Sequence, residues 1–101
     1  MDNWYVGEDL KFLVEMTAPG FSMDDDDWSV TVRIGSKDVA EFKKEDCIRD
    51  NDGNWYVCIE ADILSRGPLT LVGHARIPDL DFDDGIRDEI DAKSMGKIDK
   101  I

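Results

Sequence analysis

Recognisable catalytic arrangements are scarce in this 101-residue chain, because nothing in the sequence selects a catalytic pair among its 24 Asp and Glu residues. His74 is the single histidine, and the alternation around it places it on the outward face of a predicted strand. The serines Ser65 and Ser94 lack the Gly-x-Ser-x-Gly setting of a nucleophile elbow, and no zinc spacing or Gly-rich phosphate loop occurs. We therefore predict a non-enzymatic protein with no catalytic residues and no cofactor. An enzyme would need His74, a cysteine and an aspartate to converge in one cleft.

Two acidic runs are the candidates for a metal site. Residues 24–27 are four aspartates, and acids alternate with other residues from Asp79 to Asp84. Ca²⁺ prefers several oxygen ligands, which such loops can supply. The second run fails the EF-hand register, because its sixth position is Asp84 and its twelfth is Ile90, where the motif needs Gly and Glu. We interpret both runs as solvated loops and assign no metal ligand, the alternative being a weak cation site that joins them.

Aromatic side chains are the remaining candidates for a binding surface. Trp28 and Trp55 belong to predicted inward faces and are assigned to the core. Exposed aromatics anchor protein partners or stack on sugar rings, but they also pack over the end of a sandwich as a small cluster. We favour the last interpretation for the four that fall in the N-terminal arm and in loops: Trp4, Tyr5, Phe21 and Phe82.

Hydrophobic alternation with a period of two predicts the elements that position these residues. Residues 28–34 alternate between β-branched or aromatic and polar side chains, which is typical of a half-buried antiparallel strand. Residues 10–16 and 69–77 repeat the pattern. The inward face of the last strand consists of Leu69, Leu71, Gly73, Ala75 and Ile77.

The pair Asp52-Gly53 predicts a two-residue type I′ turn between strands at 46–50 and 55–60. This register places Cys47 directly opposite Cys58. Their Cα atoms would then lie ~5.5 Å apart, within disulfide range. Because a cytoplasm keeps such thiols reduced, we interpret them as neighbouring free thiols, with a disulfide as the alternative.

Short strands without a long amphipathic helix between them predict an all-β chain. We expect a single immunoglobulin-like antiparallel β-sandwich of about seven strands over residues 1–101. Segment 97–101 either completes its own sheet or adds to the edge of a neighbouring subunit. The finer divisions are an N-terminal arm at 1–8, a helical turn at 61–65, strands near 86–92 and 97–101, and a C-terminal strand or tail at 93–101.

Charge argues against several classes of partner. The chain carries 24 acidic against 12 basic residues, a formal net charge of −12. Nucleic acids and anionic membranes attract basic surfaces, so we expect neither as a partner. No signal peptide opens the sequence and no apolar run approaches the ~18 residues of a membrane helix, so we expect a cytoplasmic protein.

Three segments, taken in order, resemble a family. They are Trp28-Ser29-Val30-Thr31-Val32 after a Pro-Gly and acidic loop, the hairpin Asp52-Gly53-Asn54-Trp55-Tyr56-Val57, and Leu64-Ser65-Arg66-Gly67-Pro68-Leu69 leading to the acidic run. The most distinctive motif is Pro-Asp-x-x-Phe-x-Asp-Gly-x-Arg at residues 78–87. This order resembles short β-sandwich proteins of prophage and mobile-element regions in gut anaerobes. It is more loosely similar to the N-terminal immunoglobulin-like domain of phage baseplate upper proteins.

The resemblance implies a virion building block, or an accessory that positions a receptor-binding protein, and therefore association with a virion after cytoplasmic synthesis. Uncovered sandwich edges invite β-pairing with another chain. We therefore predict a structural or assembly module with protein partners, or self-association, through sheet edges. The alternative is a carbohydrate- or small-ligand-binding module assisted by Ca²⁺.

Overall fold

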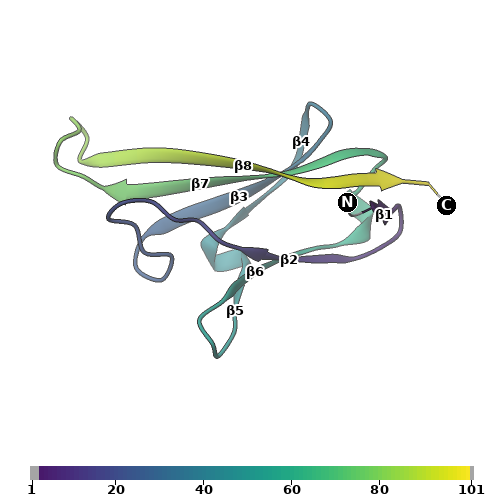
Figure 1. The fold of residues 1–101 in the computed structure, drawn as a ribbon, viewed down its shortest axis with the longest axis horizontal. Helices are drawn as coiled ribbons and strands as arrows, with labels where there is room; N and C mark the ends of the chain where they lie inside the picture. Colours follow the sequence, from purple (N-terminus) through teal and green to yellow (C-terminus); the bar gives the residue numbers. More distant parts are fainter. Residues whose placement is uncertain (1–2, 101) are drawn as a thin grey trace.

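The computed structural model describes residues 3–100, which fold into two packed sheets (Figure 1). The five-stranded sheet has the order β1-β8-β7-β3-β4, with β1 (Asn3–Tyr5), β3 (Asp27–Ile34), β4 (Lys37–Lys43), β7 (Gly67–Pro78) and β8 (Ile86–Asp99). The three-stranded sheet has the order β2-β6-β5, with β2 (Leu10–Val14), β5 (Ile48–Arg49) and β6 (Trp55–Ile59). Neighbouring strands are antiparallel except β1 and β8, which are parallel. The all-β sandwich expected from the alternation is confirmed.

The core consists of the inward faces that the alternation predicts. In β3 the side chains of Trp28, Val30, Val32 and Ile34 are buried, and the intervening residues are not. Full burial of an aliphatic or aromatic side chain contributes roughly 1.5–3 kcal/mol, so these rows hold the two sheets together. The buried indole of Trp28 keeps its polar atom satisfied, because Nε1 donates to the carbonyl of Met23 at 2.8 Å. The matching rows on the other strands are Leu10, Phe12 and Val14 in β2, Val57 and Ile59 in β6, and Leu69, Leu71, Ala75 and Ile77 in β7.

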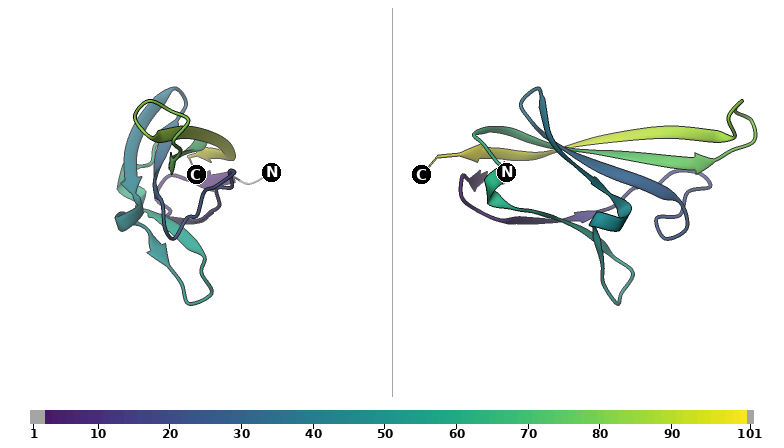
Figure 2. Two further views of the ribbon diagram at one scale, coloured as in Figure 1. Left: turned by 90° about the vertical axis from the view of Figure 1, so that its left-hand side faces the viewer. Right: turned by 180° about the vertical axis from the view of Figure 1, so that it is seen from behind.

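The two sheets differ in length, which gives the molecule its elongated shape. Its principal extents are 50 × 32 × 23 Å. Figures 1 and 2 show the β7–β8 hairpin projecting well beyond β2 and β6. Over this projecting part, the connection from β2 to β3 (residues 15–26) takes the place of a strand on the inner side of the larger sheet.

The turn between β5 and β6 is longer than the predicted two-residue turn, and the prediction is wrong. Ile48 pairs with Tyr56 and Arg49 with Trp55, so the register is shifted by one residue from that of a two-residue turn. A type I′ turn needs positive φ at both central residues, but only glycines have positive φ in the described chain. The Asp50 carboxylate accepts the backbone N–H of Asp52 and Asn54, each at 2.9 Å, and stabilises a longer turn that ends at Gly53.

This shift also overturns the expected facing pair of cysteines. The predicted strand at 46–50 is reduced to the two residues of β5, because Lys44–Asp46 forms a short 3-10 turn. Cys47 packs against the core, whereas Cys58 lies on the exposed face of β6 opposite Lys11. The two thiols therefore do not form a facing pair, since one contacts the core and the other is exposed on β6.

The C-terminal region is one long strand rather than the predicted pair at 86–92 and 97–101. β8 runs without a break, and a bulge at Met95 between Ser94 and Gly96 accommodates one extra residue against β7. Ile98 is fully buried and lies opposite both Trp4 of β1 and Gly67 of β7. Residues 97–99 thus complete their own sheet, which was the first of the two expected arrangements; residue 101 lies outside the described residues.

Two further strands lie where the sequence predicted none. Residues 3–5 of the predicted N-terminal arm form β1, and residues 1–2 lie outside the described part. β4 was missed because its burial does not alternate cleanly, since a register shift after Val32 interrupts its pairing with β3. The helical turn expected at 61–65 is present as the 3-10 turn Ala61–Ile63.

Because Ile98 is buried and Ile90 is exposed, truncation of these two isoleucines of β8 should lower the free energy of unfolding by different amounts. Ile98→Ala should lower the free energy of unfolding by about 2–5 kcal/mol, because it leaves a cavity between β1, β7 and the core. Ile90→Ala, at a side chain 71% exposed, should change it by no more than about 0.5 kcal/mol. Urea unfolding of both variants measures the difference; equal effects would show that Ile98 does not anchor the end of β8.

Candidate functional site

The candidate catalytic residues lie apart. His74 is on the outer face of the large sheet, where its Nε2 lies 2.9 Å from Oδ1 of Asp88. Arg76 Nε lies 3.7 Å from the same oxygen, and all three side chains are solvent-exposed. Cys58 belongs to the other sheet, so His74, a cysteine and an aspartate do not meet in one cleft within residues 3–100.

Both cysteines are free thiols. Burial raises the pKa of Cys47 from its ordinary 9.0 to about 11, and the negative charges of Asp46, Cys58 and Glu45 add to the rise. Cys47 is therefore protonated at neutral pH and is a poor nucleophile, because the thiolate is the reactive form.

The first acidic run is held by cationic and indole partners. Asp24 Oδ1 lies 2.9 Å from Nε of Arg49 and accepts the indole N–H of Trp55, also at 2.9 Å. These hydrogen bonds hold the pKa of Asp24 below its ordinary 3.8. The ammonium group of Lys44 donates to the carbonyls of Asp24 and Asp26. The block thus fastens the β2–β3 connection to the β5–β6 hairpin.

The second acidic run is organised by Arg87. Its Nη1 lies 2.7 Å from Oδ2 of Asp79, its Nε lies 2.9 Å from Oε2 of Glu89, and its Nη2 donates to the carbonyl of Pro19. This single side chain ties the β7–β8 loop to the β2–β3 connection. Within residues 3–100, no group of three or more acidic, histidine or cysteine side chains is placed to hold a metal ion.

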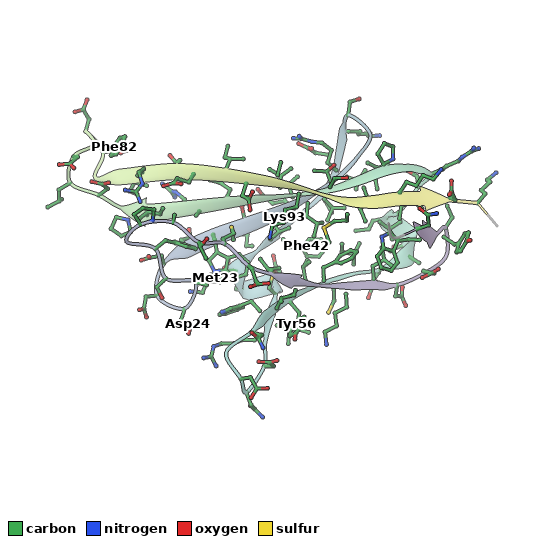
Figure 3. All side chains as sticks on the ribbon, viewed as in Figure 1. Met23, Asp24, Phe42, Tyr56, Phe82 and Lys93 are labelled. Carbon is green, nitrogen blue, oxygen red and sulfur yellow. The ribbon has the colours of Figure 1, made fainter. Side chains whose placement is uncertain are left out.

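The aromatic residues outside the core strands fall into two groups. Trp4 and Phe21 pack against the core as the expected satellite cluster. Tyr5 and Phe82 are exposed, and Figure 3 shows Phe82 at the far end of the β7–β8 hairpin. The two close ring pairs, Trp4–Phe12 and Trp28–Trp55, are nearly perpendicular, at 78° and 89°.

A groove lies between β8 and the chain segment at the end of β2. It comprises two adjoining hollows of about 530 and 120 Å³, which share Glu15, Met16, Asp91 and Lys93. One wall is the segment that follows β2, residues 15–18, and the other is residues 89–93 of β8. Figure 3 shows Lys93 on the side of β8 that faces β2.

Small residues on the inner face of β7 make room for this groove. Gly73 and Ala75 interrupt a row of large aliphatic side chains. Met16 fills the space above Gly73, since a Cβ at residue 73 would lie 2.6 Å from its Sδ. Beyond Met16, Ala75 and Phe21 form an apolar floor.

Charged side chains of β8 line the groove. Glu89, Asp91 and Lys93 lie opposite Ala75, Gly73 and Leu71 in the register, so they share the inner face of the sheet. With Glu15 across the groove, three carboxylates face one ammonium group. The rim therefore has a net negative charge on a chain that is already strongly acidic.

The groove opens along an unpaired strand edge. β1 pairs only with residues 97–99 of β8, so residues 86–96 have β7 on one side and no strand on the other within the described chain. Sequence reasoning did not identify this site. Two features of the sequence could have indicated the groove. One is the pair of small residues, Gly73 and Ala75, on the inner face of β7, and the other is the row of charged residues at alternate positions 87, 89, 91 and 93 of β8.

No family model, curated protein or solved structure matches this chain. Neither of the two short helical turns among residues 3–100 is long and apolar enough to cross a membrane.

The raised pKa of Cys47 predicts unequal alkylation of the two thiols. Iodoacetamide at pH 8 should modify exposed Cys58 first, because a shift of about two pKa units lowers the thiolate fraction of Cys47 about 100-fold. Mass spectrometry of Cys47→Ser and Cys58→Ser, each with one remaining thiol, measures both rates. The rates should converge in urea; equal rates in the folded protein would contradict the burial of Cys47.

The contact between Asp24 and Trp55 predicts a pH response in one indole. Because the pKa of Asp24 is lower in the folded protein than its ordinary 3.8, the ionised carboxylate stabilises the fold above pH 3.8. This stabilisation is lost as the pH falls through the lower pKa of the folded state. The Trp55 Nε1–H resonance should therefore shift below pH 3.8, and Asp24→Asn should abolish this titration. Trp28 is the internal control, because its indole donates to a carbonyl that does not titrate. Identical titration of both indoles would contradict the assignment.

Proposed function

We propose that this protein is a non-enzymatic assembly module that binds another protein along the free edge of β8. The observation that carries the proposal is the run of residues 86–96, whose outer edge has no strand partner in the described chain. Such an edge presents a row of backbone donors and acceptors that pair with an added strand. The adjoining groove has a volume of about 530 Å³, against about 310 Å³ for the hollow over β3 and β4 at the opposite side of the sheet.

The shape and charge of the molecule are compatible with this role. The edge lies on the hairpin that projects beyond the smaller sheet, where a partner reaches it without displacing another element (Figure 2). A net charge of −12 keeps identical copies apart, because like-charged surfaces repel. We therefore favour a different protein, rather than a second copy, as the principal partner.

The setting that we propose is a phage or prophage particle. The resemblance of the three sequence segments to prophage β-sandwich proteins, and to the immunoglobulin-like domain of baseplate upper proteins, supports it. In this proposal the chain is made in the cytoplasm and then incorporated into a baseplate or tail as an accessory component. The alternative of a sugar-binding module has less support, since the exposed aromatic side chains Tyr5 and Phe82 lie in β1 and in the β7–β8 loop, at opposite ends of the molecule, and form no common platform (Figure 1).

The test is incorporation into particles. A tagged chain is expressed in the source cells, particle formation is induced, and gradient-purified particles are probed by quantitative mass spectrometry. The chain should co-sediment with particles at a fixed ratio to the capsid protein and should resist a high-salt wash. Absence from particles, or loss in the wash, would overturn the proposal.

Proline variants test the edge itself. Of two consecutive residues on an edge strand, one directs its N–H toward the neighbouring strand and the other directs it away. Of Ala92→Pro and Lys93→Pro, the variant with the outward N–H should keep the native melting temperature. That folded variant should be excluded from particles because it cannot donate to an added strand; its normal incorporation would rule out the edge as the contact.

A further inference from the structure

The inner face of β8 carries charges where a sandwich normally has apolar residues. Arg87 is engaged by Asp79 and by Glu89. Glu15 and Asp91, by contrast, have no ion-pair partner within residues 3–100. These two carboxylates lie on opposite walls of the groove, beside the unpaired edge.

Inward charges on an edge strand reject most incoming strands. An apolar strand laid against β8 would cover Glu15 and Asp91 without giving them a partner, and burying unpaired carboxylates is costly. Charged groups of this kind protect edges from indiscriminate pairing. They do not reject a strand that brings a compensating cation, so the same groups become a source of specificity.

The remaining lining of the groove suits the stem of a long basic side chain. Met16, Phe21 and Ala75 supply apolar surface below the carboxylates. Arginine and lysine place their methylene groups on apolar surface while the charged head reaches a polar rim. A Phe ring is a favourable neighbour for a cationic group, and the flexible Met16 side chain can adapt to the methylene stem. The larger hollow, about 530 Å³, is within the range of ordinary ligand pockets.

We propose, building on the edge contact proposed above, that the groove selects an extended partner segment carrying an inward-pointing arginine or lysine. The segment pairs with residues 89–94 of β8, and its basic side chain enters between Glu15 and Asp91. The occupant is a strand of a basic protein. A second copy of this chain is disfavoured, because its own net charge of −12 adds to that of the groove.

The test uses two peptides that differ only in charge. The probes are acetyl-Thr-Val-Thr-Arg-Thr-Val-Thr-amide and the same peptide with citrulline, which is neutral and nearly isosteric with arginine. Titration into the ¹⁵N-labelled full chain should shift the amide resonances of residues 15–18 and 89–94 with the arginine peptide. Its affinity should exceed that of the citrulline peptide about tenfold at low salt and should fall as salt is added.

Protein variants assign the selectivity to the groove. Asp91→Asn and Glu15→Gln should each weaken binding of the arginine peptide about fivefold and leave the citrulline peptide unchanged. Asp62→Asn is the matched control, since it removes the same charge from an exposed position in the 3-10 turn Ala61–Ile63. Melting temperatures of all three variants confirm that they remain folded.

Three outcomes would overturn the selectivity of the groove. They are equal affinities for the two peptides, shifts located away from residues 15–18 and 89–94, and no saturable shift with either peptide at millimolar concentration. The proposed assembly role is judged separately by particle incorporation. Binding along β8 without preference for arginine would leave edge pairing intact, whereas selective peptide binding without incorporation would overturn the proposed role in particle assembly and leave the selectivity of the groove standing.

Discussion

Burial of the inner faces of β3 and β7 against β2 and β6 is the interaction on which the rest of the molecule depends. Trp28, Val32 and Leu69 are almost completely excluded from solvent at this contact. Because the three-stranded sheet is short, it covers only part of this inner face. The projecting hairpin, the free edge of β8 and the groove all follow from that difference in length.

The part of the larger sheet that lacks a covering strand is stabilised by side chains of the β2–β3 connection. Met16 occupies the space that Gly73 leaves, and Arg87 holds the carbonyl of Pro19 while it pairs with Asp79. At its other end, Asp24 is fastened to Arg49 and Trp55. One carboxylate of each acidic run therefore has a structural role, since Asp24 pairs with Arg49 and Asp79 pairs with Arg87.

The outer and inner faces of β8 differ in how their charged side chains are paired. On the outer face, Asp88 pairs with His74 and Arg76, so charge is compensated by cross-strand neighbours. On the inner face, Asp91 lies opposite Gly73, which has no side chain to compensate it. This difference between the two faces of β8 is the feature on which the proposed selectivity for a basic partner depends.

The sequence by itself determined the class of fold and the inward rows of β2, β3 and β7. Alternation can be seen within each short segment, and the face of the strand that carries the apolar residues is the one that becomes buried. It did not determine the β5–β6 register, since the Asp50 carboxylate stabilises a longer turn than Asp52-Gly53 suggests. Nor did it determine the parallel pairing of β1 with the end of β8, which joins residues more than ninety positions apart. Only tertiary structure brought Glu15 and Asp91 to one groove, because their proximity depends on how two sheets of unequal length pack.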